Sequence, residues 1–152
     1  MESMKQAIFK LGDEEYGMNI MDVNIIEKFI PVEPLANAPK NLKGKIQLRG
    51  DVIPVYSLRK KFGLEERDAD GETRFILSTS KGMTIAYEVD KMNEIAQLEA
   101  HQIYQVPQIL ESKDTSYIEN LTKIGDRLIL LLNHNDLISE EEQEIIKALI
   151  KK

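Results

Sequence analysis

The sequence predicts an all-β protein, a barrel or sandwich of short strands that ends in one amphipathic helix. Short apolar runs rich in β-branched residues follow one another closely along the chain, and glycine-containing turns separate most of them. Only the last segment has helical periodicity. Many short strands at close spacing are typical of barrels and sandwiches. No linker divides the 152 residues, so we expect a single domain over residues 1–152.

The first part of the chain is expected to form five strands. A Gly-Asp-Glu-Glu turn joins the first two strands into a hairpin, and Gly50 supplies the turn between the last two. Between the third and fourth strands, an extended connection is predicted by Pro31, Pro34 and Pro39, because proline disfavours helix at its own position and at the preceding residue. The expected strands span residues 6–11, 16–21, 23–30, 45–48 and 52–58.

Pro54 falls inside the fifth of these strands. Since proline cannot donate a hydrogen bond to a neighbouring strand, we expect this strand to lie at a sheet edge or to contain a bulge. Residues 59–63 predict a short helical turn that ends at Gly63. The polar residues 65–72 predict a mobile loop.

The second part of the chain is expected to contain two further hairpins and one further strand. The hairpins are residues 74–80 with 83–89, across Lys81-Gly82, and residues 117–124 with 127–132, across Gly125-Asp126. Residues 93–99 predict the additional strand, and residues 100–116 show no regular pattern. The segment that begins at Gly50 resembles the one that begins at Gly125, about half the chain length away. This similarity is a weak indication of an internal repeat.

The C-terminal segment predicts a helix over residues 140–150. Ser139 and Glu142 have the spacing of a capping box, in which each side chain bonds the other residue's amide. Acidic residues precede and lysines follow, as the helix dipole favours. One face is apolar and carries Ile145, Ile146, Leu149 and Ile150.

Composition excludes several function classes. The absence of cysteine excludes disulfides, thiol catalysis and iron–sulfur clusters. A net charge of −6 disfavours nucleic-acid binding, although a local positive patch is compatible with it. The N-terminus shows no signal peptide, and no apolar run approaches the ~20 residues of a spanning helix. We therefore expect a soluble protein, and the lack of cysteine is compatible with a reducing, cytoplasmic location.

The sequence contains no recognisable catalytic or metal-binding pattern. Its two histidines, His101 and His134, lie outside any triad or metal-ligand spacing. Asp68-x-Asp70-Gly71 resembles a fragment of a calcium loop, but the remaining ligands do not follow. We therefore expect a non-enzymatic protein without cofactor or metal.

Two features remain candidates for partner binding, and each has a structural alternative. Arg49 stands between an apolar strand and a turn glycine, where it provides either a structural ion pair or a planar contact to a partner. The nearly continuous apolar run over residues 23–30 is either buried on both faces or exposes one face to a partner.

The chain resembles the CheW-like chemotaxis coupling proteins over nearly its whole length. Matching residues include Phe9-x-Leu11-Gly12-Asp13-Glu14-Glu15-Tyr16-Gly17-Met18, Ala38-Pro39, Lys43-Gly44-x-Ile46-x-Leu48-Arg49-Gly50-Asp51-Val52-Ile53-Pro54-Val55, the segment from Leu58 to Leu64, and Gly125-Asp126-Arg127-Leu128. Departures are Gln47 in place of a usual asparagine, Ser57 and Asn133 in place of usual aspartates, and Glu119-Asn120 in place of a glycine.

The resemblance implies two five-stranded SH3- or OB-like β-barrel subdomains packed together, with the C-terminal helix added. It implies an adaptor that couples chemoreceptors to the regulatory domain of the histidine kinase CheA, and that is associated with membrane receptor arrays through these partners. Arg49 matches the family's near-invariant arginine, and Val23 and Gly44 match positions linked to coupling in relatives. Ile25 belongs to the apolar run next to Val23, which is expected near the groove where receptors dock, and completes the expected partner-binding set.

One alternative stays open at this point. Small β-barrels often bind oligonucleotides or small ligands, so a binding module for single-stranded nucleic acid is a second hypothesis. The acidic charge and an aromatic content of 6% weaken it, because base stacking needs exposed rings.

Overall fold

A computed structural model describes residues 4–106 and 117–150 of the chain. The eleven strands within this part are β1 (Met4–Leu11), β2 (Glu14–Asn19), β3 (Ile25–Lys28), β4 (Leu42–Leu48), β5 (Asp51–Ser57), β6 (Arg74–Ser80), β7 (Met83–Val89), β8 (Lys91–Leu98), β9 (Ile103–Gln105), β10 (Ile118–Ile124) and β11 (Arg127–Leu132). Two α-helices accompany them, α1 (Leu58–Lys61) and α2 (Glu140–Ile150). Short 3-10 turns at Ile20–Asp22, Ala100–Gln102 and His134–Asp136 connect some of these elements.

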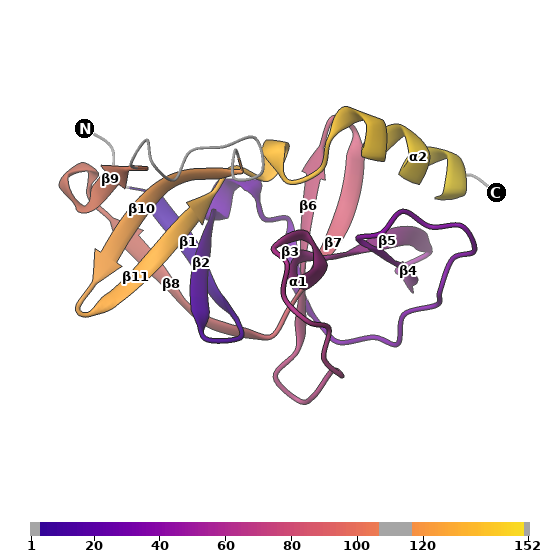
Figure 1. Ribbon diagram of the computed structural model, residues 1–152, viewed down its shortest axis with the longest axis horizontal. Coiled ribbons are helices and arrows are strands. Elements are labelled where there is room, and N and C mark those ends of the chain that lie inside the picture. Colours follow the sequence, from indigo (N-terminus) through magenta and orange to yellow (C-terminus); the bar gives the residue numbers. More distant parts are fainter. Residues whose placement is uncertain (1–3, 107–116, 151–152) are drawn as a thin grey trace.

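The strands form two sheets that lie side by side (Figure 1). Sheet A has the order β8-β1-β2-β11-β10-β9, and sheet B has the order β3-β6-β7-β5-β4. The middle of the chain forms sheet B, whereas both ends of the chain contribute to sheet A. Helix α2 lies over sheet B, near β5 (Figure 1).

The internal repeat is present in the topology. In both sheets an antiparallel hairpin lies in the middle, β1–β2 in sheet A and β6–β7 in sheet B. The second strand of that hairpin pairs in parallel with the second strand of another hairpin, β2 with β11 and β7 with β5. The similar segments at Gly50 and Gly125 are therefore the turns of equivalent hairpins, β4–β5 and β10–β11.

The core consists of three clusters, and the largest lies between the two sheets. This cluster includes Phe9 and Met18 of sheet A with Tyr56 and Tyr87 of sheet B. A second cluster lies on the other face of sheet B and a third on the other face of sheet A. Central strands are thus covered on both faces, and this explains why residues 6–11 alternate only loosely in polarity: neighbouring Ile8 and Phe9 are both fully buried, in different clusters.

Several expectations from the sequence are confirmed. The hairpin of β6 and β7 and the helix α2 have the expected bounds. Helix α1 is the expected short turn; Ser57 caps its start, and Gly63 follows it with a φ of 79°. The polar segment 65–72 contains no helix or strand, as expected of a loop.

Other boundaries were wrong. The apolar run at residues 23–30 contributes only the four-residue strand β3, because a 3-10 turn at Ile20–Asp22 precedes it and also shortens the strand expected at 16–21. Sheet A has six strands rather than five, since β9 forms within the segment expected to be irregular. The rest of that segment, residues 107–116, lies outside the described residues.

The expectation that the strand containing Pro54 lies at a sheet edge or contains a bulge was wrong. Strand β5 lies between β7 and β4 and is not an edge strand. Its ladder with β7 begins only at Val55, so Pro54 lies just before the segment that is paired on that side. The register shift of this hairpin falls in β4, between Leu42 and Gly44.

Candidate partner-binding site

Arg49 lies in a two-residue turn between β4 and β5. Arg49 and Gly50 both have positive φ, 52° and 85°, as the tight hairpin turns compatible with strand twist require. The left-handed conformation costs a residue other than glycine about 1 kcal/mol. Lys81-Gly82 adopts the same pair of angles in the β6–β7 turn, at 52° and 80°, so this backbone geometry alone does not distinguish Arg49.

The Arg49 side chain forms an ion pair and remains largely exposed. Its Nη2 donates a hydrogen bond to Oε1 of Glu27 on β3 at 2.9 Å, and the side chain is 69% exposed. An exposed pair of this kind contributes about 0–1 kcal/mol. A guanidinium has five N–H donors, and Glu27 accepts from one nitrogen of Arg49, so most of the donor capacity faces solvent. Both interpretations of Arg49 from the sequence are therefore compatible with its environment.

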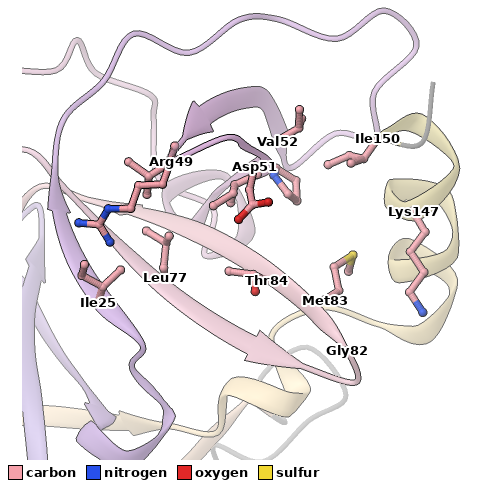
Figure 2. A pocket seen from close by; sticks show the side chains of 13 residues that line it. Ile25, Arg49, Asp51, Val52, Leu77, Gly82, Met83, Thr84, Lys147 and Ile150 are labelled. Atoms are coloured by element: carbon pink, nitrogen blue, oxygen red, sulfur yellow. The ribbon is translucent and has the colours of Figure 1, made fainter.

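Beside Arg49 lies an open groove of about 610 Å³ (Figure 2). Its apolar surface comes from side chains of sheet B, among them Ile25, Leu48, Ile53 and Leu77. The end of the β6–β7 hairpin contributes Met83 and Thr84, and the last turns of α2 contribute Lys147 and Ile150. The groove thus lies between two hairpin ends and the C-terminal helix.

The structure brings together two of the four expected partner-binding residues. Arg49 and Ile25 both line the groove. Val23, two residues before Ile25, packs instead against the core cluster between the sheets, because it ends the 3-10 turn and is not part of β3.

Gly44 is buried in β4, and its backbone explains why a glycine stands there. A Cβ at this position would lie 2.1 Å from the carbonyl oxygen of Glu33. The neighbouring residue, Lys45, exchanges two backbone hydrogen bonds with Glu33, each of 2.9 Å. The glycine therefore permits this close pairing at the outer edge of sheet B, a structural role that the sequence did not reveal.

A second arginine, Arg127, lies in the equivalent hairpin of sheet A, directly after its turn rather than within it. It begins β11, and its Nη2 contacts both Glu15 of β2 and Glu94 of the edge strand β8 at 2.7 Å. Its Nε donates a further hydrogen bond to Glu15 at 2.9 Å. The hydrogen bond from Arg127 lowers the pKa of Glu15 below its usual value, against the opposing effect of burial.

A third arginine joins the two sheets. Arg59 of α1 forms two hydrogen bonds to the Asp90 carboxylate, at 2.9 and 2.6 Å, and both side chains are mostly buried. The Gly12 amide in the β1–β2 turn donates to the same carboxylate at 2.7 Å. Burial raises the pKa of Asp90, but the hydrogen bonds from Arg59 and Gly12 outweigh it and hold the pKa below its usual value.

The departures at Ser57 and Asn133 preserve a local role. Ser57 is the buried last residue of β5 and accepts a hydrogen bond from the Lys60 amide at the start of α1. Asn133 follows β11 and accepts one from the Asn135 amide at the start of a 3-10 turn. Serine, asparagine and aspartate all serve as N-caps, so an exchange among them keeps these turns capped.

Sequence reasoning missed the contribution of α2 to the groove. The sequence places Lys147 and Ile150 on a helix, but their position over sheet B depends on how α2 packs. One hydrogen bond connects the helix to sheet B: Glu142 of α2 accepts it from the hydroxyl of Tyr56 on β5 at 3.0 Å. No pattern within either segment relates these two residues, which are 86 positions apart.

The described part of the chain offers neither a metal cluster nor a spanning helix. Residues 4–106 and 117–150 contain no group of three or more histidine or acidic side chains positioned to hold a metal ion. Within these ranges no helix has the length and apolarity required to span a membrane.

Comparisons with known proteins agree with this architecture. The family model of the CheW-like domain matches residues 6–142. The chemotaxis protein CheW of Klebsiella aerogenes is 32% identical over 144 residues, which cover 95% of this chain and 87% of that protein. The chemotaxis protein CheW of Bacillus subtilis is 26% identical over 140 residues, covering 92% of this chain and 90% of that protein.

A solved structure shows the same fold. The crystal structure of the scaffolding protein TtCheW from Thermoanaerobacter tengcongensis superposes with a TM-score of 0.83 at 27% identity, and the match covers 93% of this chain and 92% of that chain. The family match, the relatives and this structure each cover most of the chain, so the protein belongs to the CheW-like family.

Proposed function

We propose that this protein is a non-enzymatic chemotaxis adaptor that couples chemoreceptors to the regulatory domain of the histidine kinase CheA. Its relatives are chemotaxis proteins, and the similar solved structure is that of a scaffolding protein. The observation that carries the proposal is the position of Arg49: this signature residue is 69% exposed at the edge of a partly apolar groove, where a partner can reach it.

Such an adaptor works through binding free energy alone. One surface holds the receptor and another holds the kinase, and the coupling between the two binding events changes kinase activity. The groove offers apolar contact area, and Arg49 offers planar donors for carboxylates or carbonyls of a partner. In this proposal the protein acts in the cytoplasm at the receptor arrays.

The nucleic-acid alternative has less support in the structure. Most aromatic rings are buried in the core or packed against it, including Phe9, Tyr56, Phe75 and Tyr87. In the described part of the chain, Tyr104 is the one strongly exposed aromatic side chain. A surface that binds single strands by stacking usually presents several rings along a basic groove.

Isothermal titration calorimetry with a cognate CheA regulatory domain, and separately with a soluble receptor tip, tests the proposal. We expect both to bind the wild-type protein and Arg49→Ala to weaken at least one of the two interactions about tenfold. Arg67→Ala is the matched control, because Arg67 is also an exposed arginine with acidic partners, Asp70 and Asp90, and does not line the groove. Failure of the wild-type protein to bind either partner at high micromolar concentration would contradict the adaptor role.

A further inference from the structure

The last turns of α2 form one side of the groove beside Arg49. Lys147 and Ile150 line it from the helix, and Leu48 and Ile53 line it from sheet B. Figure 2 shows Arg49 and Lys147 on opposite sides of the groove, with Asp51 and Thr84 between them. The helix is therefore part of this surface as well as part of the core.

The packing of α2 fixes where these two side chains lie. The Ser139 hydroxyl accepts a hydrogen bond from the Glu142 amide at 3.1 Å, which caps the first turn. Glu142 also accepts a hydrogen bond from Tyr56, and Ile146 is fully buried in the cluster between the sheets. Lys147 directly follows this anchored residue, so its direction toward the groove is set by the helix.

The groove has a cationic edge in an acidic protein. The chain carries a net charge of −6, yet Arg49 and Lys147 flank the groove and Asp51 is the one acidic side chain that lines it. Among the described residues no carboxylate lies within ion-pair distance of Lys147, and Arg49 has one, Glu27. A groove with apolar walls and these two cations at its ends is complementary to an apolar segment whose carboxylates lie near Arg49 and Lys147 and away from Asp51.

The two faces of β3 separate this groove from the contact between the sheets. Ile25 lines the groove, whereas the next residue, Ile26, packs against the cluster between sheets A and B. An adaptor that binds two partners at once needs surfaces that do not overlap. Partners that use opposite faces of β3 do not overlap, so the groove can hold one partner while the other binds elsewhere.

We propose that the end of α2 is part of the kinase-binding surface, where Lys147 and Ile150, together with Arg49, bind an apolar, carboxylate-bearing segment of the kinase regulatory domain. This inference rests on the adaptor function proposed above. It assigns to the C-terminal helix a role in selecting the partner, through one cation and one apolar side chain.

Charge and shape variants of α2 test this role. We expect Lys147→Glu to weaken binding of the kinase regulatory domain at least tenfold in calorimetry and to leave binding of a receptor tip within about twofold. Lys147→Gln removes the charge without placing a carboxylate at the negative end of the helix dipole, and we expect a smaller loss. Ile150→Ala should weaken kinase binding as well.

Matched controls lie on the same protein. Lys123→Glu makes the same charge change at an exposed lysine on β10 of sheet A, and Ile145→Ala shortens an isoleucine of α2 that does not line the groove. We expect both to bind the kinase domain as the wild type does. Circular dichroism and thermal unfolding of each variant verify that α2 remains folded.

The outcomes separate this inference from the function on which it rests. If the wild type binds neither partner, the adaptor function fails and this inference fails with it. If the wild type binds the kinase domain but Lys147→Glu binds it equally well, or loses both partners equally, the role of α2 is wrong and the adaptor function stands. The role of α2 is also wrong if Lys147→Glu changes only self-association, measured by sedimentation, since the occupant is then a second copy of this chain.

Discussion

The β10–β11 hairpin of sheet A and the β4–β5 hairpin of sheet B have equivalent places in the fold, but their arginines have different environments. Arg127 contacts two carboxylates, on β2 and on the edge strand β8. Arg49 contacts one carboxylate, on the edge strand β3, and is 69% exposed where Arg127 is 41% exposed. In both sheets an arginine connects the hairpin to a glutamate of the edge strand.

The difference shows how a repeated structural contact can become available for binding. The two carboxylates of Glu15 and Glu94 satisfy much of the donor capacity of Arg127, so we interpret this arginine as structural. Arg49 retains free donors beside an apolar groove, so we assign it to partner binding. Substitutions test this division, from the largest expected effect on stability to the smallest.

Arg59 joins the two sheets through Asp90, and Arg59→Ala tests how much this connection stabilises the fold. The substitution leaves Asp90, whose side chain is 12% exposed, without its main partner. Loss of one member of such a buried pair typically costs about 3 kcal/mol of unfolding free energy. Urea unfolding measures the loss. Arg67→Ala removes a longer contact to the same carboxylate, 3.6 Å from a half-exposed arginine, and should cost less than about 1 kcal/mol; equal effects of the two substitutions would contradict the assignment.

The backbone pairing of β4 with Glu33 at the edge of sheet B depends on Gly44. Gly44→Ala should disturb this pairing and leave sheet A intact. The added methyl group would overlap the carbonyl oxygen of Glu33, so we expect a loss of about 2 kcal/mol in urea unfolding. Gly50→Ala is the control, because no atom lies within 4 Å of the place that its methyl group would occupy, and only its φ of 85° is unfavourable. A smaller loss for Gly44→Ala than for Gly50→Ala would show that the strand edge adjusts to the side chain.

Arg127→Ala should lower the unfolding free energy by about 1–2 kcal/mol, because Glu15 is 11% exposed and loses its main hydrogen-bond donor. We expect its affinity for the kinase domain and the receptor tip to match that of the wild type. Urea unfolding and calorimetry provide the two measurements. A loss of binding without a loss of stability would reverse the roles that we assign to the two arginines.

The pKa of Glu15 gives this effect a pH dependence. Because Arg127 holds the pKa of folded Glu15 below the usual 4.5, the stabilisation is complete above that value and is lost as the pH falls through the lower folded value. The difference in unfolding free energy between the wild type and Arg127→Ala should therefore shrink between about pH 6 and about pH 3. A difference that is constant with pH would show that the ionisation of Glu15 does not contribute.

Arg49→Ala should have the smallest effect on stability, less than about 1 kcal/mol, because its ion pair with Glu27 is exposed. Thermal unfolding measures this loss, and calorimetry should show weaker partner binding in the same variant. A stability loss as large as that of Arg127→Ala would favour a structural role for Arg49 and remove the contrast between the two hairpins.

Local patterns in the sequence were sufficient for several elements. The β6–β7 hairpin follows from two apolar runs around Lys81-Gly82, and α2 follows from the capping box at Ser139 and its apolar face. Each depends on residues within one or two turns of chain, where backbone propensity and capping decide the conformation. The resemblance around Arg49 likewise indicated the family directly from contiguous residues.

Tertiary structure decided the rest, because it depends on pairing between distant segments. Polarity along one strand does not show which neighbours it has, so the interior place of β5, the pairing of β1 with β8 and the added strand β9 became evident only in the sheets. Arg49 and Arg127 each lie next to a Gly-Asp pair in the sequence, Arg49 before it and Arg127 after it. What separates them is the second carboxylate near Arg127 and the groove that α2 completes beside Arg49, and both arise from packing across the fold.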